Sequence, residues 1–252
     1  MEEKVAIVTG ASRGIGRATA AAIARRGVHV MAVARSEVEL RSLAEAEGVQ
    51  YLVASVDDVD ACEGIIRSTR ERLGPIDILV NNAGIDTNEE RPIWNQDSQV
   101  WRRTLAVNLD APFHLTRLAA TDMVDRGWGR VVMVSSTAGS VGGASMSAYC
   151  ASKGGLEGLT RAVAYDVASA GVTCNAVAPG WVRTPMADRT ARVEADRRGV
   201  TVDRIWQERA ALYPAGRVVE PEEVAEVIAF LVSEQASAIN GEIIRVAHGG
   251  WW

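Results

Sequence analysis

Short apolar, β-branched runs alternate with longer amphipathic stretches along most of the chain. Apolar runs of this length are typical of buried strands, and the longer stretches with helical spacing predict helices. The expected strands cover residues 5–8, 28–33, 51–53, 76–80, 131–134, 172–177 and 243–246. The expected helices cover residues 17–26, 37–47, 58–73, 97–125 and 148–170. Near-continuous apolar strands separated by helices predict an α/β fold, a doubly wound parallel sheet of about seven strands with helices on both faces.

No linker, repeat or change of composition divides the chain, so a single domain spanning residues 1–252 is expected. The least regular part is the segment 184–217, which prolines and glycines interrupt. Loops of this length in a compact domain are commonly lids or disordered segments. We therefore expect a lid over a binding site at about residues 185–217. The alternative is a peripheral helical insertion.

Composition narrows the setting and the partners. The chain has 252 residues, 48% of them hydrophobic and 23% charged, which suits a globular protein with a substantial core. Its net charge is −5 and the two signs are interspersed, so nucleic acid and anionic membranes are poor partners. No run reaches the roughly 18 to 20 apolar residues of a membrane span. Three cysteines without a CxxC pair suggest neither disulfides nor a metal site, and the expected location is the cytoplasm.

A glycine-rich turn, TGASRGIG at residues 9–16, joins the first strand to the first helix. Glycines there let a pyrophosphate approach the backbone, and the helix N-terminus supplies free amides and a favourable dipole. The string also contains a G-x-S-x-G pattern around Ser12, with His248 as a conceivable base for a hydrolase. A nucleophile elbow needs an oxyanion loop from an earlier strand, whereas Ser12 follows the first strand. Phosphate binding is therefore favoured.

Three further motifs stand at the ends of successive elements. They are Asn81-Asn82-Ala83-Gly84 after the fourth strand, Ser135-Ser136 after the fifth, and Tyr149-Cys-Ala-Ser-Lys153 at the start of the next helix. In this order and spacing the chain resembles the short-chain dehydrogenase/reductase family, and within it the 3-oxoacyl-carrier-protein reductases and polyketide ketoreductases. The resemblance runs from Thr9 to Gly250 and implies a Rossmann-like fold.

Tyr149 and Lys153 stand four residues apart, so on a helix their side chains share one face. A nearby ammonium favours the phenolate of a tyrosine and suits it to acid–base work, here as proton donor to a carbonyl oxygen while hydride reaches the carbon. The resemblance implies that Lys153 also binds the nicotinamide ribose and that Ser136 donates to the substrate oxygen. It further implies that Asn108 supports a water relay to the lysine. The predicted catalytic residues are thus Asn108, Ser136, Tyr149 and Lys153.

The end of the second strand indicates the cofactor. An acidic residue there would accept hydrogen bonds from a ribose 2′-hydroxyl and repel a 2′-phosphate. This chain has Ala34 followed by Arg35, and Arg13 lies in the glycine-rich turn. Two guanidiniums that can bind phosphate oxygens favour NADP(H), the predicted cofactor, unless both are merely solvated.

The remaining cofactor contacts come from the resemblance. Ser55-Val56 stands where the family usually has Asp-Val against the adenine, and the loop Pro179–Thr184 corresponds to the one that holds the nicotinamide. His248 replaces a common family aspartate, with an effect that the sequence does not reveal. The predicted cofactor-binding residues are Gly10, Ser12, Arg13, Gly14, Ile15, Gly16, Arg35, Ser55, Val56, Asn82, Ala83, Gly84, Tyr149, Lys153, Pro179, Gly180, Val182 and Thr184.

The leading functional hypothesis is an NADPH-dependent reductase of a ketone or 3-oxoacyl group. Its substrate would be a small carbonyl compound or an acyl thioester, with carrier-bound acyl groups as one option. The lid arginines Arg183, Arg189, Arg192, Arg197 and Arg198 would then face an acyl carrier, or else form a solvated helical face. The alternatives are a dehydrogenase of a small hydroxy acid or cyclic alcohol, and a non-catalytic dinucleotide-binding regulator. Intact Ser136, Tyr149 and Lys153 argue against the regulator.

Assembly and tryptophan placement complete the expectations. The resemblance implies a homo-oligomer, a dimer of dimers, paired through the long helices and the C-terminal strand. The chain has seven tryptophans, none before residue 94. Trp94, Trp181 and Trp206 are expected to shape a substrate pocket, and Trp101 and Trp128 to be packing residues on or after the long helix. Trp251 and Trp252 are expected at a subunit contact.

Overall fold

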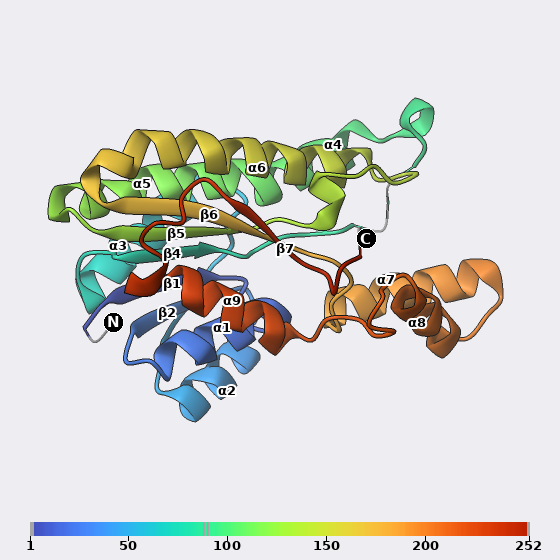
Figure 1. Ribbon diagram of the computed structural model, residues 1–252, viewed down its shortest axis with the longest axis horizontal. Coiled ribbons are helices and arrows are strands. Elements are labelled where there is room, and N and C mark those ends of the chain that lie inside the picture. The colour runs from blue at the N-terminus through green and yellow to red at the C-terminus, as the bar shows by residue number, and fades with distance from the viewer. Residues whose placement is uncertain (1–2, 88, 90, 251–252) are drawn as a thin grey trace.

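A seven-stranded parallel sheet runs through the computed structural model, which describes residues 3–87, 89 and 91–250 (Figure 1). The strand order is β3-β2-β1-β4-β5-β6-β7. The strands are β1 (Val5–Thr9), β2 (His29–Ala34), β3 (Gln50–Val53), β4 (Ile78–Asn81), β5 (Gly129–Val134), β6 (Val172–Pro179) and β7 (Ile243–Val246). The predicted fold class, a doubly wound α/β sheet with helices on both faces, is confirmed.

Helices cover both faces of this sheet (Figure 1). On one face lie α1 (Gly14–Ala24), α2 (Glu37–Glu47) and α9 (Pro221–Leu231). On the other lie α3 (Val59–Leu73), α4 (Ser98–Leu105), α5 (Ala111–Arg126) and α6 (Ser147–Val167). Two more helices, α7 (Pro185–Arg198) and α8 (Val202–Ala211), lie beyond the end of β6. Short helical turns are η1 (Ile93–Asn95), η2 (Ala106–Asp110), η3 (Thr137–Gly139), η4 (Ala168–Ala170) and η5 (Glu234–Ala236).

Burial on both faces explains why apolar residues dominate the central strands. All five residues of β1 are buried. Ala6 and Val8 belong to the core cluster beneath α1 and α9, whereas Ile7 belongs to the cluster beneath α3 and α5. Because successive side chains of a strand point to opposite faces, a polar residue at any of these positions would enter one of the two cores.

Two predicted segments differ from the structure. The single helix expected over 97–125 is divided into α4 and α5 by a π-helical turn, η2, which carries Asn108. The segment 185–217 contains α7 and α8, which pack on each other around Ala187, Ala191 and Trp206. Helix α9, which begins at Pro221, was not expected, although its N-terminus carries a capping box formed by Glu220 and Glu223.

The strand order places a binding crevice at the middle of the sheet. From β1 the chain proceeds outward to β2 and β3, then crosses back to β4 on the other side of β1. Ligands of open α/β sheets bind at such a reversal, outside the carboxyl ends of the strands. The ends of β1 and β4 carry the glycine-rich turn and the Asn81-Asn82-Ala83-Gly84 motif. The fold thus brings two of the sequence motifs to this crevice.

Two of the three cysteines lie in the core, and Trp101 and Trp128 are packing residues, as expected. Cys62 and Cys174 are buried and all three cysteines are free. Burial raises the pKa of the Cys62 thiol to about 11 and that of Cys174 to about 12, so both stay protonated at neutral pH. Trp128 packs against the core, with Lys4 Nζ 4.0 Å from its ring centroid, and Trp101 is half-buried on α4. Trp251 and Trp252 lie outside the described residues.

The described residues contain neither a candidate membrane-spanning helix nor a cluster of metal-ligating side chains. None of the helices there is both long and apolar enough to cross a membrane. In the same part of the chain, His, Cys, Asp and Glu do not gather in groups of three or more that would hold a metal ion.

Candidate active site

A cleft of about 590 Å³ opens at the carboxyl ends of the strands. It is lined by all eighteen residues predicted to bind the cofactor, and by Ser136. Its lining therefore includes Gly10, Ser12, Arg13, Gly14, Ile15, Gly16, Arg35, Ser55, Val56, Asn82, Ala83, Gly84, Tyr149, Lys153, Pro179, Gly180, Val182 and Thr184. Asn108 is not in the lining and is fully buried. The structure thus brings together three of the four predicted catalytic residues and the whole predicted cofactor set.

The glycine-rich turn is shaped for a close approach of backbone to ligand. Gly10 and Gly14 have φ angles of +67° and +55°, which side-chain-bearing residues rarely adopt. Asn82 Nδ2 donates to Thr9 O at 2.7 Å and so ties the turn to the end of β4. Arg13, at the N-cap of α1, makes no side-chain cap, so the first amides of α1 are left for a ligand. These features fit the pyrophosphate of a dinucleotide.

Substituting Gly16 with Ala should abolish cofactor binding and destabilise the fold. A Cβ at this position would lie 2.3 Å from Asn82 Nδ2 and 2.4 Å from Gly10 O, so the turn would have to move. Forced overpacking of this kind costs about 1–3 kcal/mol or more. NADPH titration and thermal unfolding measure the two effects.

Gly158→Ala is the matched control for the Gly16 substitution. Gly158 is also helical, and a Cβ there meets nothing within 4 Å. It should leave NADPH affinity unchanged and stabilise the protein by up to about 1 kcal/mol, since alanine is the better helix former. If Gly16→Ala binds NADPH as tightly as wild type, the glycine-rich turn can move to accept a Cβ and the prediction is wrong.

The hydrolase alternative is not supported by the structure. Ser12 lines the cleft, but His248 does not. Instead, His248 Nε2 lies 3.5 Å from Glu223 Oε2, beside the start of α9. The base that a serine nucleophile would need is therefore absent from the lining of this cleft.

Tyr149 and Lys153 occupy the first turns of α6 and both line the cleft. Lys153 Nζ lies 5.8 Å from the centroid of the Tyr149 ring. Lys153 is 4% exposed, and its ammonium donates a hydrogen bond to Val134 O, at the end of β5, at 2.8 Å. Burial lowers the pKa of Lys153 to about 8. A mostly protonated lysine at neutral pH, with two donors left for other partners, therefore stands beside the tyrosine ring.

The turn after β5 positions Ser136. Its Oγ accepts a hydrogen bond from the Ala138 amide at 3.2 Å, so the hydroxyl proton is left to donate. Beneath this turn, the buried carboxylate of Glu157 accepts from Ser135 Oγ at 3.1 Å and from Ser140 Oγ at 3.3 Å. Sequence reasoning missed Glu157. Its spacing from Lys153 places the two residues on one face of α6 but does not reveal the serine partners of Glu157, which lie outside that helix.

Asn108 lies behind the cleft wall in the π-helical turn. Its Oδ1 accepts from the Ile85 amide at 2.8 Å, and its Nδ2 donates to Ile85 O at 3.0 Å and to Ser152 Oγ at 3.1 Å. The side chain thus joins the loop after β4 to helix α6. These contacts make it a positioning group. The relay role predicted for Asn108 stays a prediction.

The adenosine end of the cleft carries two free cations. Arg13 and Arg35 line it and are exposed. Within the described part of the chain, neither guanidinium takes part in an ion pair or hydrogen bond. Ser55 and Val56 stand at the same end, at the place expected for adenine contacts. Both arginines are therefore available to a phosphate group.

The opposite end of the cleft is walled by the loop after β6 and by α7. Trp181, Met186, Ala187 and Thr190 line it, so the placement of Trp181 is confirmed. Two other tryptophan predictions are wrong. Trp206 is buried between α7 and α8, where its Nε1 donates to Asp188 Oδ1 at 3.1 Å, and Trp94 is 79% exposed on η1 outside the lining. The partner of the Trp206 indole N–H lies on the neighbouring helix α7, and residue spacing along the sequence does not reveal such a contact.

The lid arginines are not one free basic face. Arg198 is paired with Glu194 at 2.9 Å and with Glu208 at 2.7 Å. The Arg183 guanidinium stacks over the Trp206 ring, 4.3 Å from its centroid. Arg189 lines the cleft, and Arg192 and Arg197 are exposed. Two of the five are therefore engaged within the lid itself.

A dinucleotide-shaped crevice with a Tyr-Lys pair and a serine at its centre defines a class of oxidoreductases. The chain belongs to the short-chain dehydrogenase/reductase family, whose members act on CH–OH and C=O groups with nicotinamide cofactors. The family model that matches, described as enoyl-(acyl carrier protein) reductase, spans residues 10–250. The family and enzyme class predicted from the sequence are confirmed.

Individual relatives match over nearly their whole length. The chain is 36% identical to a 3-oxoacyl-[acyl-carrier-protein] reductase FabG of Vibrio harveyi, covering 99% of this chain and 98% of the relative. It is 35% identical to a D-beta-hydroxybutyrate dehydrogenase of Cupriavidus necator, over 98% and 97% of the two chains. A variant of actinorhodin polyketide ketoreductase, crystallised with NADPH, superposes with a TM-score of 0.92 at 35% identity, over 98% and 96%.

Proposed function

We propose that this protein is an NADPH-dependent reductase that converts a ketone or 3-oxoacyl group to a secondary alcohol. The observation that carries the proposal is one cleft that holds Tyr149, Lys153 and Ser136 at its centre and two unpaired arginines at its adenosine end. The cofactor prediction agrees with the comparisons, since the superposed ketoreductase was crystallised with NADPH. The relatives named as reductases of 3-oxoacyl groups support the substrate class.

The residues divide the chemistry among them. The hydride that adds to the carbonyl carbon would come from NADPH held in this cleft. Ser136 donates a hydrogen bond to the carbonyl oxygen and stabilises its developing negative charge. Tyr149 gives its proton to that oxygen, and the Lys153 ammonium favours the resulting phenolate by Coulomb attraction. The remaining donors of Lys153 would bind the nicotinamide ribose, and Thr184 and the main chain near Val182 would bind the carboxamide; all three residues line the cleft.

A dehydrogenase of a small hydroxy acid is the second candidate. The hydroxybutyrate dehydrogenase relative favours it, and the exposed Arg189 in the cleft lining is a suitable partner for a substrate carboxylate. A non-catalytic regulator would need neither the tyrosine nor the serine, and nothing in the cleft favours it.

A substrate panel tests the proposed function directly. We expect NADPH consumption with a 3-oxoacyl thioester or a cyclic ketone, and much less with a free 3-oxo acid. Faster NADP⁺ reduction by a 3-hydroxy acid than NADPH oxidation by any ketone would favour the second candidate. Failure to consume NADPH or reduce NADP⁺ with every compound, while NADPH still binds, would leave only the regulator.

Arg35→Ala should weaken NADPH binding and leave NADH binding unchanged. A hydrogen-bonded pair with a charged group is worth about 1.5–3 kcal/mol, so the Kd for NADPH should rise about tenfold or more. Fluorescence titration with both cofactors gives the two constants. Arg41→Ala is the control, because Arg41 is an exposed arginine on α2 that pairs with Glu37 outside the cleft. Equal effects on NADPH and NADH would overturn the assignment of Arg35 to the 2′-phosphate.

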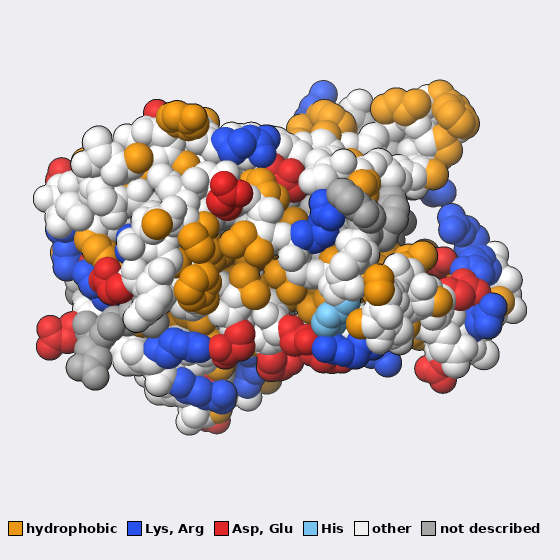
Figure 2. All heavy atoms as spheres, viewed as in Figure 1, with side chains coloured by type: hydrophobic (Ala, Val, Ile, Leu, Met, Phe, Trp, Pro, Cys, Tyr) orange, Lys and Arg blue, Asp and Glu red, His pale blue; other side chains and the backbone are white. Residues whose placement is uncertain are grey.

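Assembly and cellular location are further parts of the proposal. The protein would form a dimer of dimers in the cytoplasm. In support, Phe113 on α5 is 46% exposed and Tyr165 on α6 is 88% exposed. β7 is an edge strand with half-buried Ile243 and Ile244, and Figure 2 shows apolar side chains gathered over the part of the surface where β7 lies. A carrier-bound acyl group would approach along α7, past Arg189.

A further inference from the structure

A buried guanidinium lies in the lid, outside the residues that line the cleft. Arg209 on α8 is 5% exposed, and its guanidinium carbon lies 3.6 Å from the centroid of the Trp181 ring and 5.0 Å from that of the Trp206 ring. Stacking of a guanidinium on indole is among the stronger cation–π contacts, more so when water is excluded. Arg209 therefore holds the Trp181 ring from behind.

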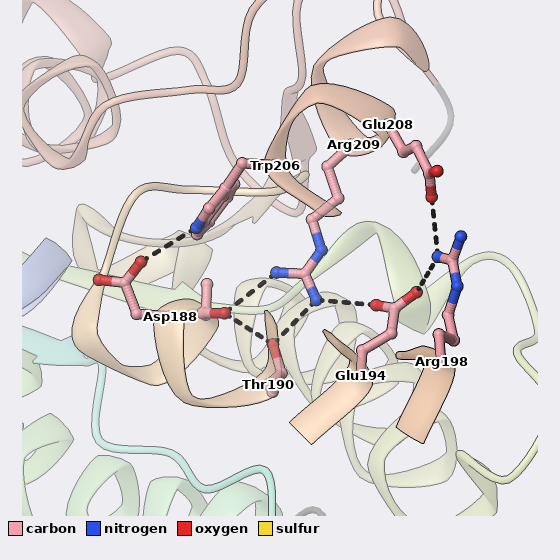
Figure 3. A network of polar contacts seen from close by, with 8 residues as sticks. Asp188, Thr190, Glu194, Arg198, Trp206, Glu208 and Arg209 are labelled. Carbon is pink, nitrogen blue, oxygen red and sulfur yellow. Dashed lines mark hydrogen bonds and ion pairs between the residues drawn. The ribbon is translucent and has the colours of Figure 1, made fainter. Parts of the chain in front are cut away.

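The same guanidinium also fixes helix α7. Arg209 donates from Nη1 to Ala187 O at 3.0 Å, and from Nη2 to Thr190 Oγ1 and Glu194 Oε2, both at 3.2 Å (Figure 3). Ala187, Thr190 and Trp181 all line the cleft, whereas Arg209 does not. The guanidinium of Arg209 thus contacts three residues that line the cleft, although Arg209 is not itself part of the lining.

Neighbouring contacts reinforce the arrangement. The Trp181 amide donates to the hydroxyl of Tyr213, two residues beyond the end of α8, at 2.6 Å. The ring of Trp181 is thus held from α8 and its main chain from the turn that follows α8. Burial lowers the pKa of Arg209, and the carboxylates of Glu194, Asp86 and Asp188 oppose this. Asp86 belongs to the cleft wall after β4, so the charge of Arg209 is attracted toward that wall.

We propose that Arg209 is a positioning residue that sets substrate specificity by fixing the Trp181 ring and the cleft face of α7. The inference rests on the proposed function, because it concerns which carbonyl substrates the cleft accepts. A rigid wall discriminates among side chains by shape. A hydrophobic pocket distinguishes substrates that differ by one methylene group by about 10- to 200-fold, and only while its walls stay in place.

Arg209→Met tests the proposal with a series of small ketones of increasing chain length. Without the guanidinium, Trp181 and Thr190 lose their fixed positions, and the ratio of kcat/KM for the longest to the shortest ketone should rise by about tenfold or more. The Kd for NADPH should stay within about threefold, since the mutated side chain lies outside the cofactor end. Methionine keeps the apolar volume, and Glu194 retains Arg198 as a partner, so no buried carboxylate is left unpaired.

Arg198→Met is the matched control. It removes a lid arginine that shares Glu194 with Arg209, but Arg198 is exposed and contacts no cleft residue in the hydrogen bonds and ion pairs of the described chain. Its ketone ratio should stay within about twofold of wild type, as expected of surface ion pairs. Equal ratios in the two variants, or an unchanged ratio in Arg209→Met, would overturn the proposal.

A second variant and the activity of the wild-type protein separate a folding defect and a wrong function from a wrong role of Arg209. If Arg209→Met fails to fold in thermal unfolding, Arg209→Lys takes its place: it keeps the charge but lacks the planar fork, and the same shift in ratio is expected. Wild-type protein that turns over no ketone would contradict the proposed function. Wild-type turnover with an unchanged ratio in the variants would contradict only the role of Arg209.

Discussion

Replacing Tyr149 with Phe is expected to lower kcat for ketone reduction by about 10²- to 10⁴-fold, the usual contribution of a positioned general acid. The substitution removes only the hydroxyl, so the ring keeps its place 5.8 Å from Lys153 Nζ. NADPH affinity should therefore change little, and the loss should fall on the chemical step. Steady-state kinetics with NADPH and the best ketone of the panel, together with NADPH titration, separate the two quantities.

Tyr165→Phe is the control for this substitution. Tyr165 lies on the same helix, α6, and is 88% exposed, so loss of its hydroxyl should leave kcat unchanged. Turnover of Tyr149→Phe above about one tenth of wild type would be incompatible with a general acid at this position. Loss of NADPH binding in the same variant would instead show that the hydroxyl serves the cofactor.

The parts of the fold that the sequence predicts are those with two-sided burial. β1, β5 and β6 are buried at every position, and the apolar, β-branched residues that dominate them distinguish them from the helices around them. The π-helical turn at Ala106–Asp110 has no such pattern, because one additional residue per turn leaves the apolar spacing of α4 and α5 nearly intact. The lid helices were obscured in the same way, since their small core depends on contacts between α7 and α8.

Some residues of the candidate site could be predicted from the sequence and others could not. Residues that meet the ligand through short motifs, such as the glycine-rich turn and the Tyr149–Lys153 pair, could be predicted because their spacing is local. Glu157 and Arg209 could not, since their partners come from other elements: Ser135 and Ser140 in one case, Trp181 and Thr190 in the other. Long-range packing decides which polar residues are buried, and one sequence does not show it.

Replacing Lys153 with Met is expected to abolish turnover and, in the cofactor-free protein at pH 7, to stabilise the fold. Burial lowers the pKa of Lys153 from 10.5 to about 8. Since a pKa shift of one unit corresponds to about 1.4 kcal/mol, burial of the ammonium lowers the free energy of unfolding by about 3 kcal/mol. Loss of the hydrogen bond to Val134 O removes about 1 kcal/mol of this gain, leaving a net stabilisation of about 2 kcal/mol.

The pH dependence identifies the buried charge as the cause. Between about pH 8 and 10.5 the unfolded chain binds the Lys153 proton and the folded chain does not, so wild-type stability rises with pH across this window. The advantage of Lys153→Met should therefore be complete below pH 8 and fall across this window, until near pH 10.5 the lost hydrogen bond leaves the variant about 1 kcal/mol less stable than wild type. Urea unfolding at pH 7 and at about pH 10 measures it. Tyr149→Phe, which is inactive but keeps the ammonium, should show no such gain, and a Lys153→Met protein less stable than wild type at pH 7 would mean that the contacts of the ammonium outweigh its burial.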